Sequence, residues 1–321
     1  MNYNPQLVKR NEKSNKGTFG RVLVISGSLN MSGCVYFCSM AAYRTGCGIV
    51  NVFTDASNLA SLKILVPEAI FDFFNNAKHP VICEEEPNYM QRLDYLLSKA
   101  DSVVIGPGLG VTEDSYKLVE YVIKHYEKNI VVDADAINCI ATKFKMNGIL
   151  EDNYEADKEN PLYNVGKDRK IIITPHLTEL SRLTKESVDT LKLKLEEYSL
   201  NIAKKYGIIA VCKDYVTKVS DGEEVYSNQS GNSSLSTAGT GDILAGMIAS
   251  LIITDEYTFR AVNTAVYLHG KAGENAGKEF TEYSCMARDV LNNIPKAISS
   301  LKVDDRYYNN CVILEVLNAN K

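Results

Sequence analysis

Short runs of β-branched and other apolar residues alternate along the chain with amphipathic stretches of helical period. The apolar runs lie at residues 21–26, 49–54, 102–105, 129–133, 170–174 and 208–213. Stretches at 32–45, 116–126 and 192–206 repeat apolar residues three or four positions apart, which predicts helices between the strands. Because parallel strands need crossover helices, the pattern predicts a mostly parallel sheet covered by helices on both faces.

The pattern changes in the second half of the chain. Residues 216–219 and 224–226 are strand-like and flank a Ser-Asp-Gly turn, which predicts an antiparallel hairpin late in the sheet. Helical patterns then dominate residues 242–301. The polar stretch 144–168 has no clear period, which indicates a surface insertion or a mobile loop. Since no repeat or linker is visible, we expect one α/β/α domain over residues 1–321.

Composition excludes several classes of protein. An apolar content of 45% and a charged content of 23% are typical of soluble globular proteins, and a net charge of −5 argues against a nucleic-acid surface. No apolar run approaches the roughly 20 residues that span a bilayer, and the N-terminus lacks the apolar core of a signal peptide. The eight cysteines contain no C-x-x-C pair, which favours reduced, buried thiols over disulfides or a metal site. We therefore expect a cytoplasmic protein with neither membrane nor nucleic acid as a partner.

The segment 236–242 is the most informative, because it is a glycine-rich turn that opens into an apolar helix. Glycines let the backbone approach a ligand closely, and a helix N-terminus presents unpaired N–H groups with a partial positive charge. The segment therefore predicts an anion site suited to phosphoryl transfer. Asp242, in the first turn, could take a proton from a substrate hydroxyl or could simply cap the helix. One buried face is predicted to comprise Ile243, Leu244, Met247, Ile248 and Leu251.

Four further motifs directly follow predicted strands, where open α/β sheets bind their ligands. They are Gly27-Ser28 and the segments 106–110, 133–138 and 174–179. Taken alone, Gly106-Pro-Gly-Leu-Gly110 could be a plain turn, and it lacks the spacing of a dinucleotide fingerprint. The shared placement predicts that all four motifs meet at one edge of the sheet.

Two of these motifs carry titratable groups whose roles stay open. Asp133 and Asp135 are predicted to end a strand with both side chains on the same face, where they could bind Mg²⁺. A structural role, as one helix cap and one buried hydrogen-bonded aspartate, is the favoured interpretation. His176 lies beside Glu179 and is predicted to contact a ligand, and Arg182 could pair with Glu179 one helical turn away.

Polar residues near the hairpin offer further candidates. Lys213 could contact nucleotide phosphates or be an ordinary solvated lysine. The small polar loop 230–234 could cradle phosphates or be flexible. His79, His125 and His269 are interpreted as surface or packing residues.

Taken in order, the motifs resemble those of the NAD(P)H-hydrate dehydratase family, which belongs to the ribokinase-like superfamily. The similar segments are 16–28, 31–34, 41–48, 106–110, 133–136, 174–179 with Arg182-Leu183, 238–242, 268–270 and 286–290. Gly-Thr-Gly-Asp242 alone would indicate only the wider superfamily. The resemblance implies a three-layer α/β/α ribokinase-like fold with a mostly parallel central sheet, a core at 16–301 and an insertion at 144–168.

The family repairs nicotinamide cofactors in which water has added across the C5–C6 bond of the ring. The resemblance therefore implies a lyase that restores NAD(P)H from hydrated NAD(P)H while it cleaves ADP to AMP, or ATP to ADP, with release of phosphate. Mg²⁺ is expected to screen the nucleotide phosphates, and a homotetramer that works with a separate epimerase is expected. The choice of ADP or ATP, and of hydrated NADH or NADPH, stays open.

The resemblance also implies roles for particular residues. Asp242 would deprotonate the C6 hydroxyl, and the N–H groups around Gly239 and Gly241 would stabilise the transferring phosphoryl group. The residues implied at the hydrated dinucleotide are Cys34, Gly108, His176, Glu179 and Asp242. Those implied at the adenine nucleotide are Lys213, Asp214, Tyr215, Val216, Thr217, Asn232, Thr240 and Gly241. Asp214 stands where the family usually has glycine and is expected to weaken phosphate binding, whereas Cys34 replaces a usual alanine.

Two other functions remain as alternatives. A small-molecule kinase of the same superfamily, acting on a hydroxymethylpyrimidine or hydroxyethylthiazole alcohol, would share Gly-Thr-Gly-Asp242 but would not need the motif at 174–179. A non-catalytic nucleotide-binding regulator would keep the pocket without turnover, and the intact Asp242 argues against it.

Overall fold

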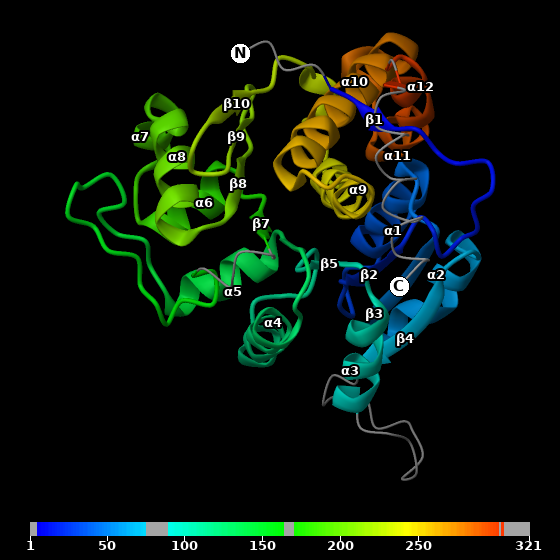
Figure 1. Cartoon of the computed structure of the whole chain (residues 1–321), viewed down its shortest axis with the longest axis horizontal. Helices are drawn as coiled ribbons and strands as arrows, with labels where there is room; N and C mark the ends of the chain where they lie inside the picture. The colour runs from blue at the N-terminus through cyan, green and yellow to red at the C-terminus, as the bar shows by residue number, and fades with distance from the viewer. Residues whose placement is uncertain (1–4, 75–88, 164–169, 302, 305–321) are drawn as a thin grey trace, which may run out of the picture.

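The computed structural model describes residues 5–74, 89–163, 170–301 and 303–304, so His79 and the end of the polar stretch 144–168 lie outside the described residues. The central sheet has nine strands (Figure 1). Their order across the sheet is β10 (Val225–Ser227), β9 (Lys218–Ser220), β8 (Ile209–Cys212), β7 (Ile171–Ile173), β6 (Ile130–Val132), β5 (Ser102–Ile105), β2 (Arg21–Ile25), β3 (Ile49–Asp55) and β4 (Ile70–Phe74). The strands from β8 to β4 are mutually parallel, whereas β9 and β10 form the predicted antiparallel hairpin. All six predicted buried strands are confirmed, and β4 was not predicted.

Two helical layers cover the two faces of this sheet. One face packs against α1 (Gly33–Thr45), α9 (Thr240–Thr254), α10 (Thr258–Ser284), α11 (Ala287–Asn292) and α12 (Ile294–Ser299). The other packs against α3 (Tyr89–Lys99), α4 (Glu113–His125), α5 (Asp135–Lys143), α6 (Leu177–Thr184), α7 (Val188–Leu193) and α8 (Leu195–Tyr206). Shorter elements are η1 (Ala56–Asn58), α2 (Leu59–Leu65), η2 (Ser233–Leu235) and a two-stranded parallel sheet of β1 (Leu7–Val8) and β11 (Val303–Asp304).

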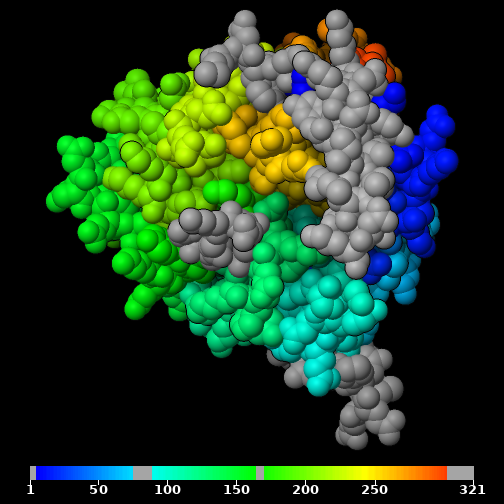
Figure 2. Space-filling view, in the orientation of Figure 1, coloured from blue at the N-terminus to red at the C-terminus, as the bar shows by residue number. Residues whose placement is uncertain are grey.

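Alternation along the strands explains the two layers. Successive side chains of a strand point to opposite faces, so Val22 and Val24 contribute to one buried cluster and Leu23 and Ile25 to the other. A strand that is apolar at every position is therefore stable only between two layers of helices. The predicted three-layer α/β/α architecture is confirmed. Figure 2 shows the segments of α6, α7 and α8, coloured green, on the side of the molecule opposite the blue N-terminal segment.

The helix that begins in the glycine-rich turn is buried more completely than the sequence predicted. The five apolar residues predicted on one face of α9 are all buried, but residues on its other faces are buried too. The predicted buried face is therefore confirmed, and the burial of the other faces follows because α9 contacts α1, α10 and the strands β2, β5 and β6. Close approach to α1 depends on Gly246, where an added Cβ would lie 2.2 Å from the carbonyl oxygen of Cys38.

The described part of the polar stretch, residues 144–163, contains neither helix nor strand. It is nevertheless anchored, because Met146, Ile149 and Leu162 are fully or almost fully buried in the core cluster beside α8. The Lys205 ammonium group of α8 also donates to the Ile149 carbonyl at 2.8 Å. That this stretch is an insertion into the family core stays a prediction.

Two further expectations concern the whole chain. The six described cysteines are buried free thiols, as predicted from their spacing. In the part of the chain that the structure describes, no helix combines the length and apolarity needed to span a membrane.

Candidate functional site

The carboxyl ends of five adjacent strands bring the predicted motifs together. The Gly27 N–H donates to the Pro107 carbonyl at 2.9 Å, which joins the turns after β2 and β5. The Gly110 N–H donates to the Asp135 carboxylate at 2.9 Å, which joins the turns after β5 and β6. The Lys213 N–H donates to the Pro175 carbonyl at 2.8 Å, which joins the ends of β8 and β7. The predicted meeting of the motifs at one edge of the sheet is therefore confirmed.

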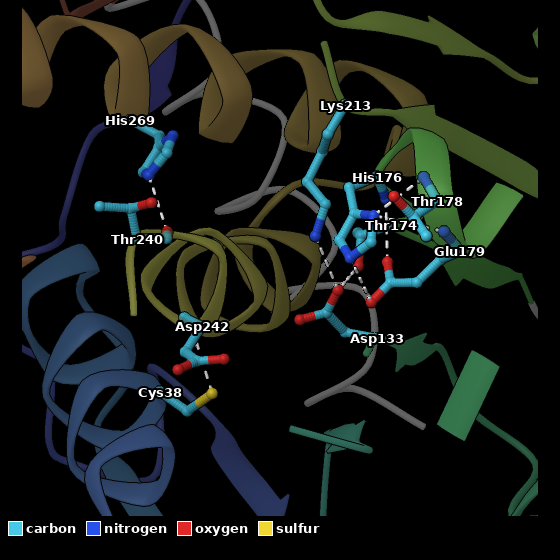
Figure 3. A network of polar contacts seen from close by, with 10 residues as sticks. All are labelled: Cys38, Asp133, Thr174, His176, Thr178, Glu179, Lys213, Thr240, Asp242 and His269. Carbon is cyan, nitrogen blue, oxygen red and sulfur yellow. Dashed lines mark hydrogen bonds and ion pairs between the residues drawn. The ribbon is translucent and has the colours of Figure 1, made fainter. Parts of the chain in front are cut away.

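Asp133, directly after β6, is the hub of the polar contacts at this edge (Figure 3). Its Oδ1 accepts a hydrogen bond from the Thr174 hydroxyl at 2.5 Å and one from the Lys213 ammonium group at 3.0 Å. The Asp133 side chain is only 1% exposed. A buried charge is tolerated when it is paired and hydrogen-bonded, and Asp133 meets both conditions.

Asp133 and Asp135 do not end a strand together, so the strand-based prediction for this pair was wrong. Between them Ala134 has a φ of 50°, and Asp135 is already the first residue of α5. The two carboxylates consequently serve different partners, Lys213 and Gly110, which agrees with the structural role that we favoured. Within the described residues no group of three or more His, Cys, Asp or Glu side chains could hold a metal ion.

His176 and Glu179 form a capping box at the start of α6. The His176 Nδ1 accepts hydrogen bonds from the N–H groups of Thr178 and Glu179, at 3.1 and 3.3 Å. The Glu179 carboxylate accepts from the His176 N–H at 2.9 Å and lies 3.2 Å from the imidazole Nε2. Because Nδ1 accepts, the neutral imidazole carries its proton on Nε2, toward Glu179. Arg182 donates to Asn138 at 2.9 Å, so its predicted pairing with Glu179 was wrong.

Electrostatics couple the carboxylates at this edge. Burial, and after it the nearby Asp133 carboxylate, raises the pKa of Asp242 to about 7 against the opposing effect of Lys213. Burial likewise raises the pKa of Glu179 to about 7. Burial alone would lower the pKa of Lys213, but Asp133, Glu179 and Asp242 reverse that effect and raise it. Carboxyl groups that titrate near neutral pH are typical of sites that move protons.

Asp242 is positioned by the glycine-rich turn but does not cap the helix. Gly239 occupies the N-cap position with a φ of 96° and provides no side-chain hydrogen bond. Asp242 is the third residue of α9, and across the described residues its carboxylate has no hydrogen bond. The N–H groups of Gly239, Gly241 and Asp242 likewise have no acceptor in the described part of the chain. Three free donors therefore lie beside one uncommitted carboxylate, which is the arrangement that the sequence predicted for an anion site.

Contacts from α10 and α1 fix the first turn of α9. The buried His269 is neutral because burial lowers its pKa to about 4, and its Nε2 donates to the Thr240 carbonyl at 2.9 Å. The Thr240 hydroxyl lies 2.8 Å from the Leu235 carbonyl and 2.9 Å from the Thr237 carbonyl, so its proton is used within the protein. The Cys38 thiol donates to the Asp242 carbonyl at 3.1 Å. The sequence did not reveal that His269 and Cys38 support this turn, although His269 lies in one of the segments that carry the resemblance.

Gly108 and Cys34 meet near Asp242, whose charge acts on the Cys34 thiol. A Cβ added at Gly108 would lie 2.4 Å from the Cys34 sulfur, and the φ of 65° at Gly108 also favours glycine. Burial raises the pKa of Cys34 to about 12, so its thiol is neutral at physiological pH. Gly108 and Cys34 are therefore buried, uncharged neighbours of the carboxylate.

The residues predicted at the nucleotide are brought together only in part. The Lys213 ammonium group lies 3.4 Å from the position of a Cβ on Gly241, so it touches the first turn of α9. Asp214, Val216 and Thr217 form the half-buried loop between β8 and β9, in which the Tyr215 side chain is 92% exposed. Asn232 lies at the start of η2, where its side chain accepts from the Ser234 N–H at 3.2 Å.

A cavity of about 620 Å³ lies elsewhere, between the N-terminal segment and the C-terminal ends of α1 and α9. It shares no residue with the site described above. The site is therefore identified by its titratable groups and free N–H donors rather than by the size of a cavity.

Comparisons with known proteins cover nearly the whole chain. Residues 22–296 match the family model described as NAD(P)H-hydrate dehydratase. The chain is 29% identical over 296 residues to an ADP-dependent (S)-NAD(P)H-hydrate dehydratase from Staphylococcus aureus, covering 92% of this chain and 94% of that protein. It is also 29% identical over 300 residues to a bifunctional NAD(P)H-hydrate repair enzyme from Thermofilum pendens, covering 93% of this chain and 53% of that one.

The chain thus spans about half the length of the bifunctional relative and nearly all of the single-function one. Among solved structures it resembles the Bacillus subtilis ADP/ATP-dependent NAD(P)H-hydrate dehydratase co-crystallised with ATP and Mg²⁺. The TM-score is 0.75 at 25% identity, over 94% of this chain and 100% of that one. The similarity in sequence and the similarity in fold therefore point to the same family over nearly the full length of the chain.

Proposed function

Because this chain belongs to the NAD(P)H-hydrate dehydratase family, we propose that it is a carbon–oxygen lyase that dehydrates hydrated NADH or NADPH at the expense of ADP or ATP. The observation that carries the proposal is the Asp242 carboxylate, which is free of hydrogen bonds within the described residues and lies beside unpaired N–H groups at the start of α9. A base next to an anion site is what this reaction requires.

The chemistry follows from the choice of leaving group. Hydroxide leaves carbon poorly, whereas phosphate leaves readily. Asp242 takes the proton of the C6 hydroxyl, whose oxygen attacks the terminal phosphorus of the nucleotide, and the P–O bond to the remaining nucleotide breaks. Phosphate then leaves C6 with the C–O electron pair, and loss of the C5 proton restores the double bond. A pKa of about 7 suits Asp242 to this step, because a general base is most effective near the operating pH.

Other residues bind and orient the two substrates. The N–H groups of Gly239 and Gly241 stabilise charge on the transferring phosphoryl group. The hydrated dinucleotide is bound along Cys34, Gly108, His176 and Glu179, next to Asp242. The adenine nucleotide is bound by the loop 213–217, with Asn232, Thr240 and Gly241 on its other side, and Thr240 contributes by shaping the turn.

Mg²⁺ enters this proposal as part of the nucleotide co-substrate. Asp133 and Asp135 are committed to Lys213 and Gly110, so the described side chains offer no ligand set for a resident metal. The ion supplies neutralisation of the phosphate charge when the nucleotide binds. A homotetramer in the cytoplasm, which acts with a separate epimerase, completes the proposal.

The test is recovery of the near-ultraviolet absorbance of the reduced ring from purified hydrated NADH, with Mg²⁺ and either ADP or ATP. We expect recovery with one nucleotide, release of free phosphate, and loss of both in Asp242→Asn. Folded protein that binds nucleotide but recovers no absorbance with either would overturn the proposal. A stable phosphomonoester formed from an alcohol substrate would instead support the small-molecule kinase, and nucleotide binding with no turnover on any substrate would support the regulator.

A further inference from the structure

Lys213 is the central cation of the site, and its ammonium group is already engaged. Its Nζ lies 3.0 Å from the Asp133 carboxylate, and the Lys213 side chain is 20% exposed against 1% for Asp133. The same carboxylate oxygen accepts from the Thr174 hydroxyl, which fixes its direction (Figure 3). Drawing Lys213 outward to a phosphate would leave the Asp133 charge buried and unpaired, which is costly.

We propose that Lys213 is a positioning residue whose ammonium group, held by Asp133 against the first turn of α9, keeps the Asp242 carboxylate ionised as a base, and that it is not a ligand of the nucleotide phosphates. This inference rests on the proposed function. It revises the role that the family resemblance implied for the Lys213 side chain, and leaves the backbone of the loop 213–217 free to bind the nucleotide.

The charges that surround Asp242 come from several elements. Acidic groups are Asp133 after β6, Asp135 on α5 and Glu179 on α6, and each opposes ionisation of Asp242. Lys213 at the end of β8 is the cation that favours it. The remaining titratable neighbours are Cys34 and Cys38 on α1, which burial keeps as neutral thiols, and His176 and His269, whose pKa values burial lowers.

This balance explains why one lysine matters. Asp242 would be protonated near neutral pH, and so unable to accept the hydroxyl proton, if three carboxylates acted on it without a counter-charge. Nζ of Lys213 is close enough to the helix that a side chain at Gly241 would contact it at 3.4 Å. The ammonium group therefore lies directly against the first turn of α9, beside the residue that carries the base.

The test compares pH profiles of kcat/KM for hydrated NADH at saturating Mg²⁺-nucleotide. In the wild type we expect an acid limb that reports ionisation of the base. Lys213→Met should move this limb to higher pH by about one unit or more, since an opposite charge at close range shifts a carboxyl group by about that amount. Asp133→Asn removes a repelling charge but keeps an amide oxygen that can accept from Lys213, so it should move the limb to lower pH. The KM for the nucleotide should change far less than kcat in Lys213→Met.

Further variants separate this role from a merely structural one. Lys213→Arg keeps the positive charge and should retain the acid limb of the wild type. The double variant Asp133→Asn with Lys213→Met removes both charges, and its acid limb should lie closer to that of the wild type than the limb of Lys213→Met does. Lys218 lies in the same hairpin but pairs with Glu196, away from the site. Lys218→Met should therefore leave the pH profile unchanged. If Lys213→Met does not fold, Asp133→Asn and the double variant still test the direction of the shift.

The outcomes distinguish the inference from the function on which it rests. A wild-type protein without dehydratase activity would overturn the proposed function. An active wild type whose acid limb stays in place in both Lys213→Met and Asp133→Asn would overturn the inference alone. A large rise in nucleotide KM with an unmoved limb in Lys213→Met would assign Lys213 to the phosphates instead.

Discussion

Replacement of Asp242 by asparagine should abolish activity and, at neutral pH, stabilise the fold. Burial raises the pKa of this carboxyl from 3.8 to about 7, so the unfolded chain holds the charged form more readily than the folded protein does. A carboxyl with a raised pKa lowers the free energy of unfolding progressively as pH rises from its unfolded to its folded pKa, and the penalty is constant above that. Asparagine carries no charge in either state and removes the penalty.

The magnitude follows from the size of the shift. About three pKa units at about 1.36 kcal/mol each give an upper bound of roughly 4 kcal/mol at neutral pH. Relaxation of the site and partial exposure of the carboxyl reduce this, so we expect a gain of about 2–4 kcal/mol. Active sites that hold a charge where the fold disfavours it commonly show this conflict between stability and activity.

The assay is urea unfolding of the wild type and Asp242→Asn without nucleotide, at several pH values between about 4 and 8. The gain should be largest at the highest pH and should shrink to a small remainder toward pH 4, close to the unfolded pKa of 3.8, because it vanishes only where both states of the wild type are protonated. Asp189→Asn, at an exposed position in α7, is the matched control and should change stability by less than about 0.5 kcal/mol. A variant no more stable than the wild type at pH 8, or a gain independent of pH, would refute the reasoning.

Two glycines give further predictions. Gly246→Ala should lower the free energy of unfolding by about 1–3 kcal/mol, since its Cβ would lie 2.2 Å from a carbonyl oxygen of α1. Gly33→Ala is the control, because no atom lies within 4 Å of a Cβ added at Gly33, and thermal unfolding should show no loss of stability in this variant. Equal losses in Gly246→Ala and Gly33→Ala would contradict the steric argument. Gly108→Ala should raise KM for the hydrated dinucleotide about tenfold, or about 1.4 kcal/mol, through crowding of Cys34. Gly110→Ala has a similarly unfavourable φ but open space around it, so a matching rise in KM there would point to backbone strain instead.

The capping box at α6 bears on the choice between a dehydratase and a small-molecule kinase. His176 and Glu179 satisfy each other's backbone N–H groups, so part of this motif is explained by the start of a helix. Glu179 is nevertheless almost fully buried beside Asp133 and Lys213, which an ordinary capping acid would not require. The motif therefore has both a local structural role and a place in the electrostatics of the site.

The sequence by itself determined the layers of the fold and the edge at which the chemistry lies. Strands that are apolar at every position, separated by helices, predict a parallel sheet between two helical layers. Motifs that directly follow such strands must meet, because the carboxyl ends of parallel strands share one edge. A continuous apolar run and a helical period of three to four residues each lie within a short stretch of chain, so they are encoded locally and can be read from the sequence.

Only the tertiary structure decided which groups become partners. Lys213 pairs with Asp133, 80 residues away, because β6 and β8 lie on either side of β7 and their carboxyl ends reach the same edge of the sheet. Arg182 bonds Asn138 rather than Glu179 for a similar reason, since α5 and α6 pack together. Such pairs depend on strand order and on packing between distant segments. Strand order and long-range packing cannot be read from a local sequence pattern, and the ionisation of Asp242 depends on both of them.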